Sequence, residues 1–441
     1  MVKLTNTFSK LQNIKTLVIG DFMLDRYTYG NVNRISPEAP VSILKVRNEE
    51  MKLGGAGNVV LNLLSLGASV IAIGRIGDDN AGDTVIKLLN DHGCISNNLF
   101  IQKNYQTPVK NRLIAESQQV LRVDFEKEEP LSTILENKII KKLPKLIKSV
   151  KVIAISDYAK GFLSDKLIRF VIDIARENKV CVIVDPKGLD FNKYKSANII
   201  KPNLKEAYSA VNLSLDADLN IVAQKILDQT KIDNLLITRS SDGISLFSKD
   251  LKRQDFPVRS KEVKDVTGAG DTVLAMLCIA LGNGLDLPVA SQLANIAASI
   301  AIEHIGCAQI TLADFAKRLL EYDTENKIFD FSHLFALKKA LENKRFNLLG
   351  INSTSGMTSA ILRAIKKLSK TKNDTIIYVL DENPDDEFAD LLSSVNEVSF
   401  IILHNKSLKN LFTEILPEKV FILKKDVLNE LKNSKELIKL C

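Results

Sequence analysis

The stretch that says most about the fold is DVTGAGDTVLAMLCIA, residues 265–280, in which a glycine-rich turn opens an apolar helix. Glycines at a helix start leave backbone N–H groups unpaired, and the helix dipole favours negative charge there, so the turn is a candidate phosphate site. Asp271 lies just past the glycines, where a carboxylate can deprotonate an alcohol during phosphoryl transfer. The simpler alternative is that Thr267 or Asp271 only caps the helix. The turn lacks the GxxxxGK[ST] spacing of a P-loop.

Outside this turn, strand-length apolar runs alternate with amphipathic helical segments, as in KTLVIGD (15–21) followed by GGAGNVVLNLLSLG (54–67). Such alternation predicts βαβ units and a doubly wound α/β domain with a parallel sheet. Residues 22–51 and 101–125 break the pattern, because they have the character of paired strands without helices between them. We expect these two stretches to form a small β-lid on one edge of the sheet.

The length of 441 residues predicts more than one domain. The first domain is expected over residues 1–320, followed by a charged helical connector over 321–340. A βα pattern begins again at FNLLGIN (346–352). It predicts a smaller, Rossmann-like α/β domain over residues 341–441.

Composition argues against several classes of protein. Hydrophobic residues make up 45% and charged residues 26%, without an apolar run of membrane length or a signal core at the N-terminus, so a cytoplasmic location is expected. The net charge of +7 is small for this length and the lysines are spread out, which disfavours nucleic-acid binding. The five cysteines and four histidines are scattered without metal-ligand spacing, so neither a disulfide framework nor a zinc site is expected.

Polar residues follow several predicted strands, at the carboxyl edge where open α/β sheets bind ligands. The residues near the N-terminus suited to a polyhydroxyl ligand are Asp21, Asp25, Gly54, Gly55 and Asn58. The simpler alternative is that the glycines only permit a tight turn and the aspartates are surface groups.

Three later strands also end in polar segments, SDYAKG (156–161), DPKG (185–188) and KPNLKE (201–206). Lys160 and Lys187 are candidates for phosphate contacts. Asn203 and Glu206 are candidates for acting on Mg²⁺ through water. Each of these residues can equally be a solvated loop residue.

Together, LGGAGN (53–58) and DVTGAGDT (265–272) resemble the ribokinase-like (PfkB) carbohydrate kinases. Within that superfamily, residues 10–315 look most like the kinase half of the bifunctional heptose 7-phosphate kinase and heptose 1-phosphate adenylyltransferase family. The stretches that carry this likeness are GDFMLDRYTYGNVNRISPEAPVSILKV (20–46), SDYAKG, DPKGLDF (185–191) and DVTGAGDT. The resemblance implies ATP-dependent, Mg²⁺-assisted phosphorylation at O1 of a heptose 7-phosphate.

The resemblance also implies roles for individual residues. Asp271 matches the catalytic base, and Gly268, Ala269 and Gly270 match the anion hole. The nucleotide and metal side comprises Asn203, Glu206 (a metal contact through water), Thr238, Arg239, Gly243 and Thr267. The sugar-phosphate side comprises Asp25, Arg34, Gly54, Gly55, Asn58, Lys110, Arg112, Arg122, Asp157 and Lys187. Several of these are basic, as a phosphorylated sugar requires.

The C-terminal part departs from that family. Its nucleotidyltransferase carries an HxGH signature, whereas this chain has TSGM at residues 354–357. Methionine cannot donate a charged hydrogen bond to phosphate, so we expect the fold to be partly kept and adenylyltransferase activity to be lost. Two alternatives remain: a kinase of another sugar or sugar phosphate, and a non-catalytic scaffold or regulator. By analogy with lid pairing in the superfamily, a homodimer is expected.

Overall fold

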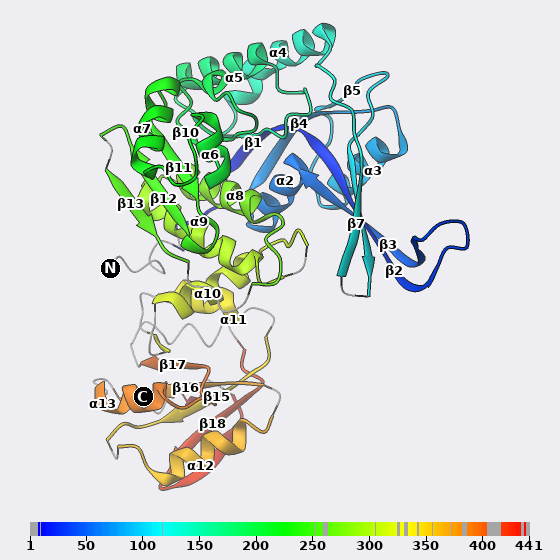
Figure 1. Cartoon of the computed structure of the whole chain (residues 1–441). Helices are drawn as coiled ribbons and strands as arrows, with labels where there is room; N and C mark the ends of the chain where they lie inside the picture. The colour runs from blue at the N-terminus through cyan, green and yellow to red at the C-terminus, as the bar shows by residue number, and fades with distance from the viewer. Residues whose placement is uncertain are drawn as a thin grey trace. The chain divides into compact units, whose positions relative to one another are not determined.

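The computed structural model describes residues 8, 10–116, 118–250, 252–258, 263–304, 306–323, 327–329, 334–341, 344–354, 356–371, 373–381, 386–403, 416–433 and 436–437 (Figure 1). The chain divides into two compact units, Gln12–Ile310 and a second unit formed by Met1–Leu11 with Thr311–Cys441. Within the described ranges, none of the helices is both long and apolar enough to span a bilayer.

The larger unit is built on a nine-stranded sheet, which confirms the predicted doubly wound α/β fold. The strand order is β13-β12-β11-β10-β9-β8-β1-β4-β5. The strands are β1 (Lys15–Gly20), β4 (Ser69–Ile76), β5 (Leu99–Ile101), β8 (Val152–Ser156), β9 (Cys181–Asp185), β10 (Ile199–Ile200), β11 (Asn234–Thr238), β12 (Ile244–Ser248) and β13 (Arg253–Phe256). Pairing is parallel from β5 to β11, and β12 and β13 add an antiparallel hairpin that the sequence interpretation missed.

Helices cover both faces of this sheet. One face packs against α4 (Thr133–Ile147), α5 (Asp165–Glu177) and α7 (Leu219–Thr230) in one apolar cluster, with α6 (Leu204–Ala210) beside α7. The other face packs against α2 (Ala56–Ser65) and α8 (Ala269–Gly282), with α9 (Leu287–Ala301) against α8 and α3 (Asn80–Asp91) beside α2. Helix α8 is enclosed on all sides by these neighbours, which explains why it is apolar around its whole circumference.

A separate four-stranded sheet, ordered β3-β2-β6-β7, forms where the β-lid was expected. Its strands are β2 (Phe22–Ile35), β3 (Ser42–Gly55), β6 (Val109–Ala115) and β7 (Gln118–Phe125). Only Asp21 separates β1 from β2, and β3 runs directly into α2. The backbone amide of Ala56 donates to the carbonyl of Asp21 at 2.9 Å. This bond joins the segment that enters the lid, between β1 and β2, to the segment that leaves it, between β3 and α2.

The smaller unit contains a six-stranded sheet ordered β14-β17-β16-β15-β18-β19, with only β19 antiparallel. Its strands are β14 (Ile328–Phe329), β15 (Phe346–Ile351), β16 (Asp374–Val379), β17 (Phe400–Leu403), β18 (Lys419–Lys424) and β19 (Val427–Leu431). Its helices are α10 (Leu312–Asp323), α11 (Leu334–Leu341), α12 (Ser359–Leu368) and α13 (Asp386–Ser393).

The division between the units falls after Ile310, whereas the sequence placed it at residue 320. Helix α10 belongs to the smaller unit, where the Phe8 and Phe315 rings pack with centroids 6.2 Å apart. Of the connector expected over 321–340, residues 324–326 and 330–333 lie outside the described residues, and the remainder comprises the end of α10, β14 and most of α11.

Candidate active site

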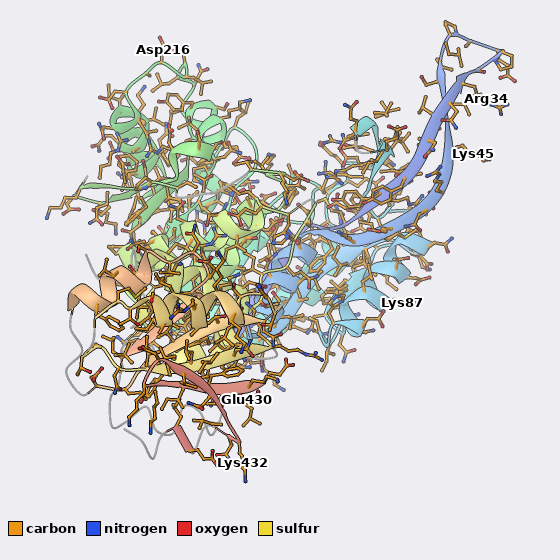
Figure 2. The ribbon with its side chains drawn as sticks, turned by 90° about the horizontal axis from the view of Figure 1, so that it is seen from below. Arg34, Lys45, Lys87, Asp216, Glu430 and Lys432 are labelled. Atoms are coloured by element: carbon orange, nitrogen blue, oxygen red, sulfur yellow. The ribbon has the colours of Figure 1, made fainter. Side chains whose placement is uncertain are left out.

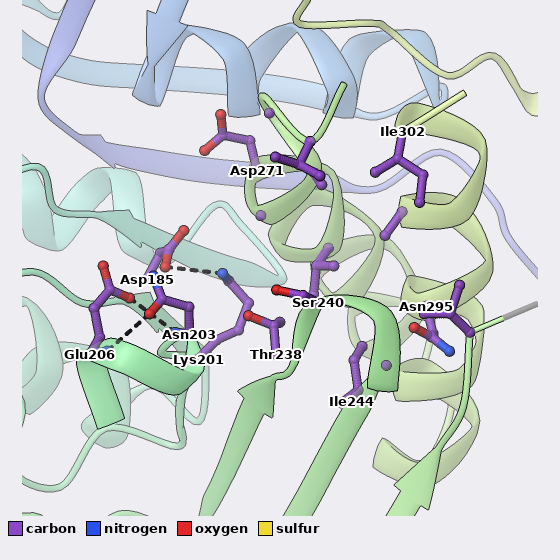
Figure 3. A pocket seen from close by; sticks show the side chains of 18 of the residues that line it. Asp185, Lys201, Asn203, Glu206, Thr238, Ser240, Ile244, Asp271, Asn295 and Ile302 are labelled. Carbon is purple, nitrogen blue, oxygen red and sulfur yellow. Dashed lines mark hydrogen bonds and ion pairs between the residues drawn. The ribbon is translucent and has the colours of Figure 1, made fainter. Parts of the chain in front are cut away.

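A cavity of about 780 Å³ opens at the carboxyl ends of four adjacent strands of the main sheet (Figure 3). Each strand or the loop after it contributes polar residues, from Asp157 after β8 to Asp185 at the end of β9, Lys201 after β10 and Thr238 at the end of β11. The start of α8 closes the cavity with Gly268, Ala269, Gly270 and Asp271. The predicted phosphate turn therefore faces the same space as the polar strand ends.

The turn before α8 is shaped to leave its amides available. Gly268 has φ of 81°, a left-handed conformation that favours glycine, and among the described side chains none caps this helix start. Asp265 fixes the turn by accepting hydrogen bonds from the backbone and hydroxyl of Thr267 at 2.9 and 2.7 Å and from the Gly306 amide at 2.8 Å. Uncapped amides and the dipole of a 14-residue helix together make an anion-binding site.

Asp271 has the environment of a general base. Its carboxylate is buried and accepts hydrogen bonds from Asn58 Nδ2 at 2.7 Å and from the Tyr158 hydroxyl at 3.0 Å. Burial is the main cause that raises the pKa of Asp271 to about 7; the Asn58 bond opposes this and the charge of Asp185 adds to it. A carboxylate that titrates near neutral pH is well matched to taking a proton from an alcohol.

The buried Lys201 forms an ion pair with the partly exposed Asp185 beside the turn, and the sequence interpretation did not single out either residue. Lys201 Nζ lies 3.0 Å from Asp185 Oδ1, and the Lys201 side chain is only 3% exposed. A methyl group built on Gly270 would lie 3.6 Å from that Nζ, so the ammonium group is next to the amide donors. A fixed positive charge there can stabilise charge that develops on a transferring phosphoryl group.

Asn203 and Glu206 form a capping box at the start of α6. Each side chain accepts the other's backbone N–H, at 2.9 and 3.0 Å, and Glu206 Oε1 also contacts Lys187 Nζ at 2.7 Å. All three residues line the cavity, and Lys187 is therefore placed with Asn203 and Glu206, the residues predicted for the nucleotide and metal side. Its predicted sugar-phosphate role stays a prediction.

Of the other four residues predicted for the nucleotide side, two line the cavity and two do not. Thr238 and Gly243 line the cavity. Arg239 and Thr267 are not part of its lining: Arg239 lies 3.5 Å from Asp255, and Thr267 bonds to Asp265.

The predicted sugar side gathers at the root of the lid, close to Asp271. Asp25 is buried and ion-paired with Arg112, and its Oδ2 lies 3.8 Å from Cys307 Sγ. The same sulfur lies 3.3 Å from where a Cβ on Gly268 would be. Lys110 Nζ lies 5.4 Å from the centre of the Tyr158 ring, whose hydroxyl bonds to Asp271.

The two glycines of LGGAGN are required by this packing. A Cβ on Gly54 would approach Asp25 Oδ2 to 2.6 Å. Gly55 has φ of 58° and precedes α2, the helix that carries Asn58. The motif thus brings Asp25 and Asn58 towards the glycine turn before α8.

Four predicted residues are placed differently. Arg34 is exposed at the far end of the lid hairpin (Figure 2), and Arg122 is half exposed and paired with Asp124 at 2.9 Å. Asp157 lines the cavity, but its carboxylate already accepts bonds from Tyr194 at 2.6 Å and Lys193 at 2.7 Å. Lys160 is buried and pairs with Glu126 at 2.7 Å. The structure does not bring Arg34, Arg122 or Lys160 into the lining of the cavity.

The fold and the site together define a phosphotransferase, because amide donors, a buried cation and a base meet at one helix start. Residues 13–315 match the family model described as pfkB family carbohydrate kinase. The chain belongs to this family, and its larger unit is a sugar kinase with an alcohol group as acceptor.

Curated relatives of similar sequence support this placement. Bifunctional protein HldE of Helicobacter hepaticus is 38% identical over 403 residues, covering 89% of this chain and 82% of the relative. The protein of the same name from Campylobacter jejuni subsp. jejuni is 41% identical over 382 residues, covering 86% of this chain and 79% of the relative. The heptose-enzyme resemblance inferred from the motifs therefore agrees with curated proteins named HldE.

Solved structures bear out the fold. Arabidopsis thaliana ribokinase complexed with ribose and ATP superposes with a TM-score of 0.56 at 18% identity, covering 70% of this chain and 99% of that chain. Phosphofructokinase-2 from Escherichia coli in complex with potassium gives 0.59 at 19% identity, covering 71% and 100%.

Proposed function

We propose that this enzyme transfers the γ-phosphoryl group of ATP to O1 of D-glycero-D-manno-heptose 7-phosphate, giving the 1,7-bisphosphate used for the lipopolysaccharide core. The observation that carries the proposal is the position of Asp271 beside the uncapped amides of residues 268–270. The relation to the proteins named HldE supports the heptose acceptor. The cationic side chains Lys110 and Arg112 at the lid root suit an acceptor that already bears phosphate.

In this mechanism Asp271 accepts the proton of the sugar hydroxyl as its oxygen attacks the γ-phosphorus. The bond from phosphorus to the bridging oxygen breaks, and ADP leaves. Asn58 and Tyr158 hold the carboxylate in place, while the amides at the start of α8 and the ammonium group of Lys201 stabilise charge on the phosphoryl oxygens. Since Asp271 is buried, little solvent competes for its proton.

Mg²⁺ fits the donors of this cavity as an ion held mostly by the nucleotide. Within the described part of the chain, no three acidic, histidine or cysteine side chains are grouped to hold a metal unaided. Both oxygens of Glu206 already accept hydrogen bonds. We therefore infer that Asp185, Asn203 and Glu206 would contact the ion through water, as is common for Mg²⁺ on phosphates, where it neutralises phosphate charge.

We also propose that the smaller unit has lost adenylyl transfer. Met357 stands in place of the second histidine of HxGH and packs against the apolar cluster to which Leu349 of β15 and Ile361 of α12 belong. Ser355 lies outside the described residues. Incubation of the full chain with ATP and heptose 1-phosphate is expected to release no pyrophosphate, and release at a rate near that of the kinase reaction would contradict the proposal.

The kinase proposal is tested by NMR of the products formed from ATP, Mg²⁺ and heptose 7-phosphate. A new phosphorus signal coupled to the anomeric proton is the expected result. Phosphorylation of fructose 6-phosphate in preference to heptose would favour a kinase of another sugar phosphate. Tight nucleotide binding without ATP consumption would favour a non-catalytic scaffold. Light scattering of the same sample tests the expected homodimer, and the cytoplasmic location stays a prediction.

A further inference from the structure

Asp21, the residue between β1 and β2, uses its carboxylate to hold a nearby turn of the backbone. Its side chain is only 3% exposed and is not part of the cavity lining, so it is not placed to contact a ligand there. One carboxylate oxygen, Oδ2, accepts hydrogen bonds from the backbone amides of Tyr158 at 2.9 Å and Lys160 at 3.2 Å. Ala159, between these two amides, has φ of 55°, a left-handed conformation that is unfavourable for alanine. Two amides that converge on one anion in such a turn form a nest, and Asp21 supplies the anion.

The turn that Asp21 holds carries a side chain that contacts the proposed base. The Tyr158 hydroxyl donates to Asp271 Oδ1 at 3.0 Å, and this side chain belongs to a residue whose own amide is bonded to Asp21. The backbone carbonyl of Asp21 accepts the Ala56 amide at 2.9 Å, two residues before Asn58, which donates to Asp271 Oδ2. Asp21 therefore anchors the backbone of both segments whose side chains hold Asp271.

We propose that Asp21 is a positioning residue for phosphoryl transfer, acting through Tyr158 to orient the Asp271 carboxylate towards the acceptor hydroxyl. The proposal rests on the kinase function proposed above, in which Asp271 is the base. Without an acceptor on the side chain at position 21 the two amides would lose their partner, so the turn would relax and carry the Tyr158 hydroxyl away from Asp271. A misplacement of ~1 Å can slow a reaction by up to ~100-fold, because the base must lie within hydrogen-bond reach of the proton that it takes.

The first test measures kcat and KM of the full chain with ATP and heptose 7-phosphate. Asp21→Ala is expected to lower kcat by ~10-fold with KM for ATP within ~2-fold of the wild type, and Tyr158→Phe should lower kcat by a similar factor. The double variant is then expected to lose ~10-fold as well, whereas independent effects would multiply to ~100-fold. Asp21→Asn should keep kcat within ~3-fold of the wild type, because the asparagine carbonyl oxygen can accept both amides.

The second test needs no substrate and uses calorimetry of the full chain at pH 8, where Asp271 is ionised. Tyr158→Phe is expected to lower Tm by ~2 °C in the wild-type background and by less than ~0.5 °C in the Asp21→Ala background. Asp79→Ala is the matched control, because Asp79 also accepts two backbone amides, from Gly82 at 2.7 Å and Thr107 at 2.8 Å, and lies outside the cavity lining. In the Asp79→Ala background Tyr158→Phe should still lower Tm by ~2 °C.

Losses of kcat that multiply in the double variant would overturn the inference, and so would an equal effect of Tyr158→Phe on Tm with and without the Asp21 carboxylate. If Asp21→Ala does not fold, Asp21→Ser takes its place in both tests, because the shorter side chain keeps a hydroxyl near the turn but cannot reach both amides. The Tm series separates this inference from the kinase proposal. The expected Tm values in a chain that phosphorylates no sugar phosphate would support the contact made by Asp21 and refute the kinase, whereas phosphorylation with multiplying losses would do the reverse.

Discussion

Replacing the proposed base by its uncharged isostere, Asp271→Asn, is expected to abolish most activity and to stabilise the fold at the same time. Burial raises the pKa of Asp271 from 3.8 to about 7. Since a tenfold change in a protonation equilibrium corresponds to ~1.4 kcal/mol, holding this carboxylate ionised lowers the free energy of unfolding by ~4 kcal/mol above pH 7. The side-chain amide of Asn can still accept from Asn58 and donate to the Tyr158 hydroxyl, so the local bonds are kept.

The stabilisation depends on pH with a definite sign. Between pH 3.8 and about 7 the folded protein holds the Asp271 proton and the unfolded chain does not, so the wild type loses stability as pH rises through this window. The gain from Asp271→Asn is therefore expected to be ~4 kcal/mol at pH 8 and less than half of that at pH 5. For a unit of about 300 residues this corresponds to a rise in Tm of ~6 °C at pH 8 and of ~3 °C at pH 5.

Differential scanning calorimetry of the full chain at the two pH values measures this difference. Asp228→Asn is the control, because Asp228 is exposed on α7 and the substitution should shift Tm by less than ~1 °C at either pH. In parallel, kcat of Asp271→Asn should fall by ~10²- to 10⁴-fold, and wild-type kcat/KM should rise with pH to a plateau above about 7. A variant that is less stable than the wild type at pH 8, or equally stabilised at both pH values, would refute the reasoning.

Three further changes probe other parts of the larger unit. Lys201→Met leaves the Asp185 carboxylate, which is 17% exposed to the cavity, without its partner, so we expect a loss of ~1–3 kcal/mol in stability and of at least ~10-fold in kcat, measured by melting and steady-state kinetics. Gly54→Ala should raise KM for the sugar phosphate by ~10-fold with KM for ATP unchanged, because the new methyl group displaces Asp25; equal changes in both constants would contradict this. Arg75→Ala removes the guanidinium hydrogen bonds to the carbonyls of residues 129, 130 and 160, and it should lower the free energy of unfolding by ~3–5 kcal/mol in denaturant titrations. A loss below ~1 kcal/mol would show that water replaces these hydrogen bonds.

The parts of the site that the sequence predicted are those in which one local motif fixes the geometry. The glycines before α8 determine where the amides and Asp271 lie, because both belong to a single turn of chain. The hydrogen bond between Asp271 and Asn58, 213 residues apart, was not predicted: the resemblance placed Asn58 only on the sugar-phosphate side, and no local pattern specifies the pair.

Other parts of the site depend on the order of strands and could not be predicted locally. Asp185 and Lys201 each follow an ordinary apolar strand, and they pair because β9 and β10 are neighbours in the sheet. The β12–β13 hairpin was missed because the antiparallel edge interrupts a pattern of parallel units and because neither ISLFS nor RQDF alternates regularly between apolar and polar residues. Arg34 was grouped with the sugar by resemblance, yet it lies at the distal end of a 14-residue strand.

The root of the lid connects the lid strands directly to the residue that holds Asp271. Strand β3 continues into helix α2 without an intervening loop. The first turn of that helix contains Asn58, whose side-chain amide donates a hydrogen bond to Asp271. The position of β3 at the lid root is thus linked to the Asp271 carboxylate through Asn58. A substitution that shifts β3 at its junction with α2 would therefore also displace Asn58 and weaken its hydrogen bond to Asp271.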